Sequence, residues 1–256
     1  MFELDRCALV GMVHLLPLPG SPGWGGSMDA VLERAEADAQ ALAEGGCDAL
    51  LVENMGDLPY LKGRVHAETV AAMTRATSFV VGLGLPVGVQ VLAAANREAL
   101  GVAVASGAAF IRVEGFAYAH VADEGWIDAC AGELTRARAS IGADVHIWAD
   151  VQKKHGAHAV TGDLSLEDLC RGHGFCGADA LIITGAETGS ATSLTDVQAA
   201  KRADLPVAVG SGVTPQDAGS LAAVADALIV GSWLKQNGDW RAHVDVDRVR
   251  QLRAEI

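Results

Sequence analysis

The sequence predicts a TIM barrel, a closed (β/α)8 fold, from three observations. Eight short apolar runs recur along the chain, amphipathic stretches of helical period separate them, and no linker or low-complexity tract interrupts the pattern. Strict alternation of strands and helices gives parallel strands, and eight such units close a barrel. An open doubly wound sheet is the alternative, but the number of units and the long early strand–helix loops favour the barrel. We therefore assign residues 1–256 to a single barrel domain.

The expected elements follow directly from this pattern. The strands are expected at 7–14, 49–54, 86–92, 110–115, 145–151, 180–184, 206–210 and 227–230, and the helices at 27–44, 66–83, 96–106, 123–141, 165–171, 195–202, 215–224 and 245–255. Ser27 should cap the first helix, and Gly45 with Gly46 should end it. A quasi-repeat, GGCDALLV, GADALIIT and VADALIVG, places an aspartate before three strands, and we interpret these as structural turn residues: Asp48, Asp179 and Asp226.

Composition and charge narrow the classes of function. A net charge of −13 disfavours binding to nucleic acid or to an anionic membrane, although an anionic substrate needs only a local site. The cysteines are scattered, odd in number and without C-x-x-C spacing, which is typical of reduced thiols in a cytosolic protein: Cys7, Cys47, Cys130, Cys170 and Cys176. The apolar run near the N-terminus lacks a basic segment and soon meets Pro17 and Pro19, so we expect no signal peptide. No stretch is long enough for a membrane span.

The segment HIWADVQKKH (146–155) carries the most polar of the predicted strands. Alternate side chains of a strand point to opposite faces, so one face is aliphatic and the other bears His146, Trp148, Asp150 and Gln152. Buried polar groups are costly unless they have partners, so this face indicates a site better than it indicates stability. We expect His146, deeper in the strand, to be a hydrogen-bonded core residue.

The working face of such a barrel lies at the carboxyl ends of its strands. The polar residues expected there are His14, Glu53, Asn54, Gln90, Arg112, Glu114, Asp150 and Thr184. Arg112 and Glu114 share a parity and should both point into the barrel, where Arg112 forms either a neutralising internal salt bridge or part of the site. Carboxylates in a shared, partly dry site repel one another, so acid and base roles can separate. We expect Asp150 to be the general base, His155 or Glu114 to be the acid, and Glu53 to lie beside them.

Two further chemistries start from the same segment. Lys153 and Lys154 offer a Schiff base only if one of them is buried with a lowered pKa, so an anion clamp is the favoured role of a lysine here. A metal site is a subordinate hypothesis, because no H-x-H or H-E-x-x-H spacing supports it. Its mixed nitrogen and oxygen ligands, suited to Mn²⁺, Zn²⁺ or Mg²⁺, would be His14, Glu53, Asp150 and His155.

Glycine-rich segments follow the last three predicted strands. They are TGAETGSATS (184–193), GSGV (210–213) and GS (231–232). Glycine lets backbone N–H groups approach an anion, and the loops after strands 7 and 8 are the usual phosphate site of these barrels. We expect a phosphate or similar oxyanion on Gly189, Ser211, Gly212, Gly231 and Ser232, with Thr188 and Ser190 as further hydroxyl donors. The long loop LLPLPGSPGWGGS (15–27) after the first strand is either a lid or a rigid surface turn.

Several of these segments resemble the BtpA/SgcQ family, and the resemblance covers nearly the whole chain. The two most specific are GMVHLLPLPGSP (11–22) and WADVQKKHGAH (148–158), and the others are VENMGD (52–57), GVQVLAAANREAL (88–100), FIRVEGF (110–116), TGAETG and VGSGVT. The resemblance implies a (β/α)8 barrel. It also implies a role in photosystem I biogenesis at the thylakoid, while relatives in non-photosynthetic organisms include one beside sugar-uptake functions.

Two hypotheses for function follow. The first is a cytosolic enzyme that acts on a small phosphorylated sugar or nucleoside-like compound by carboxylate acid–base chemistry, with isomerisation, aldol-type cleavage and glycosidic cleavage all open. The second is a non-catalytic assembly or regulatory factor, peripheral to the thylakoid, with an exposed apolar patch to which Trp24, Trp126, Trp233 and Trp240 contribute unless they wall the pocket. Neither requires a certain cofactor, a nucleic acid or a membrane span, and we expect a homodimer.

Overall fold

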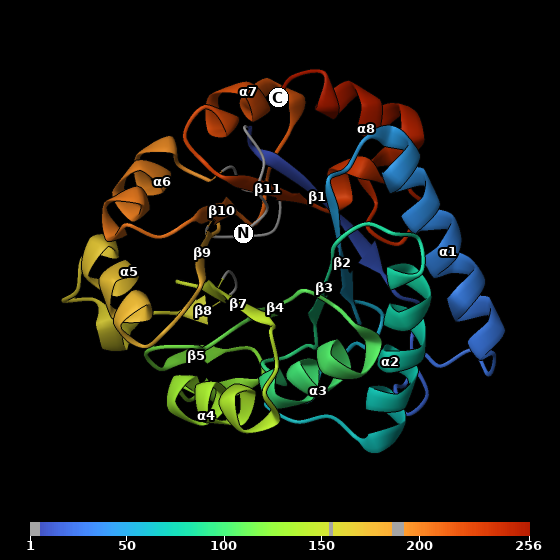
Figure 1. Cartoon of the computed structure of the whole chain (residues 1–256), viewed down its shortest axis with the longest axis horizontal. Helices are drawn as coiled ribbons and strands as arrows, with labels where there is room; N and C mark the ends of the chain where they lie inside the picture. The colour runs from blue at the N-terminus through green and yellow to red at the C-terminus, as the bar shows by residue number, and fades with distance from the viewer. Residues whose placement is uncertain (1–5, 154–155, 186–191) are drawn as a thin grey trace.

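Eight parallel strands close into a barrel around the centre of the molecule (Figure 1). The computed structural model describes residues 6–153, 156–185 and 192–256. In order around the barrel the strands are β1 (Ala8–His14), β2 (Ala49–Glu53), β3 (Val87–Gln90), β4 (Phe110–Val113), β7 (His146–Asp150), β9 (Ala180–Ile183), β10 (Val207–Val209) and β11 (Ala227–Val230), which pairs with β1 again. The predicted barrel is confirmed, and the open sheet is excluded.

Helices surround the barrel on its outside (Figure 1). They are α1 (Met28–Gly45), α2 (Ala67–Val81), α3 (Asn96–Ser106), α4 (Ala131–Ile141), α5 (Leu166–Phe175), α6 (Leu194–Ala200), α7 (Pro215–Ala222) and α8 (Val246–Arg253). Short 3-10 helices occupy Ala159–Thr161, Lys201–Ala203, Ser232–Leu234 and Gln236–Gly238. The hydroxyl of Ser27 accepts the Ala30 N–H and so caps α1, which ends at Gly46 in the left-handed conformation, φ 99°.

The expected helix at 123–141 is wrong in its first third. β5 (His120–Ala122) and β6 (Gly125–Ile127) form a hairpin there, and β8 (Gly156–Ala157) pairs with β5 to complete a small antiparallel sheet. Gly125 has φ +104°, which no helix interior accommodates, so the chain turns at Asp123 and Glu124 and α4 begins only at Ala131. This hairpin brings its two turn carboxylates to the mouth of the barrel.

The strand residues divide between two cores, as their alternation predicts. Val145, Ile147 and Ala149 pack in the layer between sheet and helices, whereas Trp148 lies inside the barrel, stacked on Phe110 with ring centroids 4.2 Å apart. The expectation for His146 is wrong: its side chain is exposed, because it begins β7 at the open amino-terminal rim.

The three aspartates of the quasi-repeat are structural, as predicted. Asp48, Asp179 and Asp226 each accept a backbone N–H from the neighbouring strand, from Leu9 at 2.8 Å, Ile147 at 2.7 Å and Val207 at 2.7 Å respectively. Each also pairs with a cation, which is Arg253, Arg138 or Lys201 in the same order. They therefore fasten adjacent strands at the rim opposite the candidate site.

Replacing Asp179 with Ala is expected to lower the free energy of unfolding by about 1–3 kcal/mol, because the Ile147 N–H and the Arg138 guanidinium lose their acceptor. Urea unfolding measures the difference. Asp144→Ala, at an exposed neighbouring position, should change the free energy of unfolding by less than about 0.5 kcal/mol. Equal losses in both variants would show that the strand-end contact contributes nothing.

No helix in the described part of the chain combines the length and the apolar character that crossing a membrane requires.

Candidate active site at the carboxyl end of the barrel

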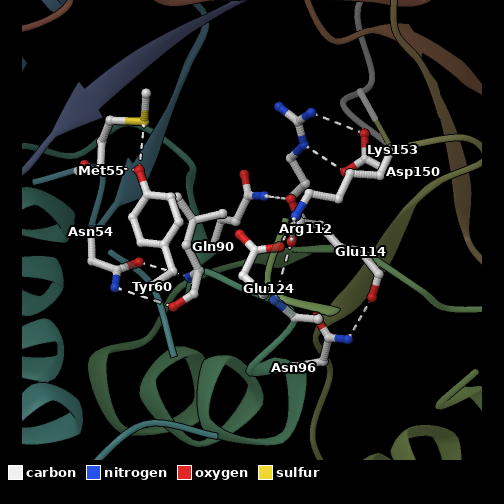
Figure 2. Close-up of polar contacts among 12 residues, drawn as sticks. Asn54, Met55, Tyr60, Gln90, Asn96, Arg112, Glu114, Glu124, Asp150 and Lys153 are labelled. Atoms are coloured by element: carbon white, nitrogen blue, oxygen red, sulfur yellow. Dashed lines mark hydrogen bonds and ion pairs between the residues drawn. The ribbon is translucent and has the colours of Figure 1, made fainter. Parts of the chain in front are cut away.

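A cavity of about 620 Å³ lies at the carboxyl ends of the barrel strands. Its volume is within the range of pockets that enclose small-molecule ligands. Residues at or just after the strand ends line it, among them His14, Glu53, Gln90, Arg112, Glu114, Asp150, Gly210 and Gly231. The predicted convergence of polar groups on one end of the barrel is therefore present, and Figure 2 shows the central part of the cluster.

Arg112 and Asp150 form a buried, two-pronged ion pair (Figure 2). The Arg112 Nε and Nη2 atoms donate to the two Asp150 oxygens, each over 2.9 Å. Burial disfavours the guanidinium charge, but Asp150 outweighs it, and the pKa of Arg112 lies above its ordinary value. The predicted internal salt bridge of Arg112 thus exists with Asp150 as its partner, and both oxygens of Asp150 are engaged.

Glu114 follows β4 and is the carboxyl group whose proton is most easily exchanged near neutral pH. Its Oε2 accepts the Ala94 N–H at 3.1 Å, and its Oε1 accepts the Gln90 Nε2 at 3.4 Å. Burial raises the pKa of Glu114 to about 7; Asp150 and Glu53 also raise it, and Lys153 and Arg112 lower it. Near neutral pH this group can therefore take up or release a proton.

Lys153 lies between two carboxylates. Its Nζ atom is 2.9 Å from Oε2 of Glu124 and 3.7 Å from Oε2 of Glu114. Burial lowers the pKa of Lys153, but Glu114 and Glu124 reverse this effect, and the net pKa is raised. The amine is thus protonated, which suits an anion clamp and does not suit a Schiff-base nucleophile.

Glu124 was missed because the sequence pattern placed it inside a helix. It lines the cavity from the β5–β6 turn, together with Asp123. The Asp-Glu-Gly sequence of that turn is the local signal that identifies a hairpin. Tyr60 was also missed; it lines the cavity, and its hydroxyl donates to the Met55 carbonyl at 2.9 Å.

His14 and Glu53 form a second pair at the ends of β1 and β2. Their Nε2 and Oε2 atoms lie 3.6 Å apart, and the His14 Nδ1 atom lies 3.4 Å from the Trp240 carbonyl oxygen. The side chain of Trp240 meets the imidazole edge-on, and both Trp233 and Trp240 line the cavity. Two of the four tryptophans therefore wall the pocket, whereas Trp126 is exposed on the small sheet.

Asn54 and Thr184, both predicted to bind substrate, do not line the cavity. The Asn54 carboxamide donates to Asp57 at 2.9 Å and accepts the Leu92 N–H at 2.7 Å, and the Thr184 hydroxyl donates to the Gln152 carbonyl at 2.9 Å. Their polar atoms are used to join loops. Asp57 also accepts the Leu18 N–H at 2.7 Å, which fastens the loop after β1, and no described residue of 15–27 lines the cavity. That loop is a packed turn.

The glycine-rich loops after β10 and β11 form another wall of the cavity. Gly210, Ser211, Gly212, Gly231 and Ser232 all line it. Within the described residues, no acceptor takes the backbone N–H groups of Gly212, Val213 and Ser232. A Cβ atom on Gly231 would lie 3.0 Å from the His14 ring, so only glycine fits there without displacing it. The expected contributions of Thr188, Gly189 and Ser190 lie outside the described residues, as do those of Lys154 and His155.

The metal hypothesis gains no ligand set from the geometry. Across 6–153, 156–185 and 192–256, no three His, Cys, Asp or Glu side chains are grouped so that they could hold an ion. Of the proposed ligands, His14 and Glu53 adjoin, Asp150 is engaged with Arg112, and His155 is not described.

The fold and the cavity define a (β/α)8-barrel protein with a polar, ligand-sized pocket at the mouth of the barrel. The chain belongs to the BtpA family, whose family model matches residues 5–256, and this confirms the resemblance drawn from the sequence. An uncharacterized protein of Caenorhabditis elegans, named as mitochondrial, is 41% identical over 100% of this chain and 95% of its own length. The photosystem I biogenesis protein BtpA of Synechocystis sp. is 41% identical over 94% and 85%.

A solved structure shares the fold at much lower sequence identity. KGPDC from Streptococcus mutans, in complex with D-ribose 5-phosphate, aligns with a TM-score of 0.62 and 12% identity, over 98% of this chain and 97% of that one. This likeness supports the barrel architecture alone.

Proposed function

We propose that the protein is an enzyme that acts on a small phosphorylated sugar through proton transfer by Glu114. The observation that carries the proposal is the position of Glu114 relative to the glycine-rich loops. In the barrel order, β3 and β4 lie diametrically opposite β10 and β11, so Glu114 and Gln90 face Gly212 and Ser232 across the cavity. A substrate held by its phosphate on one side thus extends toward the carboxyl group on the other.

The phosphate end rests on backbone donors. The N–H groups of Gly212, Val213 and Ser232 are without acceptors among the described residues, and they are donors of the kind that hold phosphates in these barrels. Ser211 is braced, because its hydroxyl accepts the Gly185 N–H at 3.0 Å and its carbonyl accepts the Thr192 hydroxyl at 3.1 Å. Such bracing fixes the loop before the ligand arrives. The KGPDC barrel, which is similar in fold, is known with the phosphorylated sugar D-ribose 5-phosphate bound.

At the reacting end, ionised Glu114 accepts a proton from the substrate. In an isomerisation, the proton leaves the carbon beside a carbonyl group, the electron pair stays on the substrate as an enediolate, and the proton returns to the neighbouring carbon. In an aldol-type cleavage, the proton leaves a hydroxyl group, and the electrons of the breaking carbon–carbon bond form the enediolate. In both, the Lys153 ammonium faces the developing negative charge. Asp150 is then the group that holds Arg112 in place, and the general-base role passes to Glu114.

Glycosidic cleavage is less well supported, because it uses two carboxyl groups as a proton-transferring pair. Both oxygens of Asp150 accept hydrogen bonds from Arg112, so Asp150 is poorly suited to be the second member.

The similarity to the Synechocystis photosystem I biogenesis protein supports an assembly or regulatory role as the second candidate function. The Caenorhabditis elegans relative is equally identical, and an animal has no photosystem. A ligand pocket retained in an assembly factor would bind a phosphorylated sugar without turning it over, so a turnover assay separates the two functions.

Binding is tested by thermal unfolding with D-ribose 5-phosphate. A ligand at 100 times its Kd stabilises the folded state by about 2.7 kcal/mol, and we expect a rise in Tm of that order. Ser232→Glu places a carboxylate among the phosphate-binding donors and should weaken binding by more than about tenfold through charge repulsion. The control Ser140→Glu adds the same charge on an exposed position of α4 and should bind normally. A parent protein without any shift, or a shift that survives Ser232→Glu, would contradict the proposal.

A further inference from the structure

Gln90 presents a buried acceptor oxygen to the cavity. Its side chain is 3% exposed at the end of β3 and lines the pocket (Figure 2). The Nε2 atom donates to Glu114, whereas no donor among the described residues reaches the Oε1 atom.

The orientation of this carboxamide depends on Glu114. An ionised carboxylate accepts hydrogen bonds and donates none, so Gln90 turns its amide nitrogen toward Glu114 and its oxygen away. The neighbouring donors are committed elsewhere: the Tyr60 hydroxyl donates to Met55, and the Asn54 amide donates to Asp57. Lys153 is held between Glu114 and Glu124. The protein therefore supplies an acceptor beside its proton-transferring group without supplying the donor.

A buried carbonyl oxygen without a donor is costly, and natural proteins leave few of them. The cost is recovered when a ligand supplies the missing O–H. A site built in this way also rejects ligands that lack the donor, because they leave the oxygen desolvated and unpaired.

We propose that Gln90 is a specificity-determining residue, which accepts a hydrogen bond from a substrate hydroxyl group held next to Glu114. The inference rests on the proposed function, since it takes the ligand to be a phosphorylated sugar. It adds that the sugar is recognised at the end remote from the phosphate through a free hydroxyl group, and that this hydroxyl lies within reach of the group that transfers the proton.

Gln90→Met tests the inference, because methionine keeps the length of the side chain and removes both polar atoms. Affinities for D-ribose 5-phosphate and for inorganic phosphate are measured by titration calorimetry, and Tm is measured without ligand. We expect the affinity for D-ribose 5-phosphate to fall at least tenfold. The affinity for inorganic phosphate, which contacts the glycine-rich loops alone, should be unchanged, and the Tm of the free protein should be unchanged or higher.

The outcomes separate the two proposals. A parent protein that binds neither probe would overturn the proposed function, and this inference with it. Binding of D-ribose 5-phosphate by Gln90→Met with the parent affinity would overturn this inference alone. An equal loss of both affinities, or a clear fall in Tm, would assign Gln90 a structural role and would equally overturn it.

Discussion

Replacing Glu114 with Gln is expected to lower turnover by about 10²- to 10⁴-fold, which is the usual contribution of a positioned general acid or base. Glutamine fills the same space and still accepts the Ala94 N–H, but it cannot take up the substrate proton. The measurement is kcat on the phosphorylated sugar that gives the largest thermal shift. Glu133→Gln, an exposed carboxylate on α4, is the matched control and should keep full activity.

The pH dependence of the parent enzyme provides a second measurement of the same role. As a base, Glu114 must be ionised, and its pKa is raised to about 7, so activity should rise with pH through that value. The groups that set this midpoint are Glu53, Arg112, Asp150, Lys153 and Glu124 around it. Activity that falls as pH rises through 7 would assign Glu114 the acid role, and an unaltered rate in Glu114→Gln would remove it from the reaction.

Stability measures the same pKa without any substrate. The folded-state pKa of Glu114 is raised above the ordinary 4.5, so the folded state binds this proton more tightly than the unfolded chain does. The resulting stability is fully present below pH 4.5 and is lost as pH rises through 7. Glu114→Gln lacks this loss, so relative to the parent it should gain up to about 3 kcal/mol between pH 4.5 and pH 8. Denaturant unfolding at several pH values measures the gain.

The sequence predicts the barrel well because burial leaves a local signature. Each of the eight strands lies within or very near its expected range, since an interior position on either face of a covered sheet must be apolar. The parity that pointed Arg112 and Asp150 into the barrel is also local. The partner of Arg112 is a different matter, because it depends on β4 and β7 becoming neighbours across the intervening hairpin.

The hairpin itself marks the limit of local reasoning. β5 gains its second neighbour from β8, about thirty residues later, and such non-local pairing leaves no periodic pattern near 120–127. The consequences reach the site, because Glu124 from this turn holds Lys153, and Lys153 in turn lowers the pKa of Glu114. The sequence therefore identifies most of the site residues, and the three-dimensional contacts assign their roles.

Arg112→Met is expected to cost about 3–5 kcal/mol of unfolding free energy, the usual result of breaking a buried ion pair. The change removes both donors to Asp150, whose side chain is 2% exposed, and leaves a carboxylate desolvated beside Glu114. Denaturant unfolding at pH 8 measures the loss. Without its guanidinium partner the pKa of Asp150 rises, so the variant should recover part of the loss as the pH is lowered toward 5.

The double variant Arg112→Met/Asp150→Leu separates the cost of an unpaired charge from the value of the pair. Replacing a buried ion pair by apolar side chains of similar volume is often neutral for stability, because the desolvation of both charges is avoided. We therefore expect the double variant to be more stable than Arg112→Met and close to the parent. It should nonetheless lose activity, since Arg112 and Asp150 both line the cavity and Asp150 contributes to the raised pKa of Glu114. A double variant as unstable as the single one would show instead that the pair stabilises the barrel in its own right.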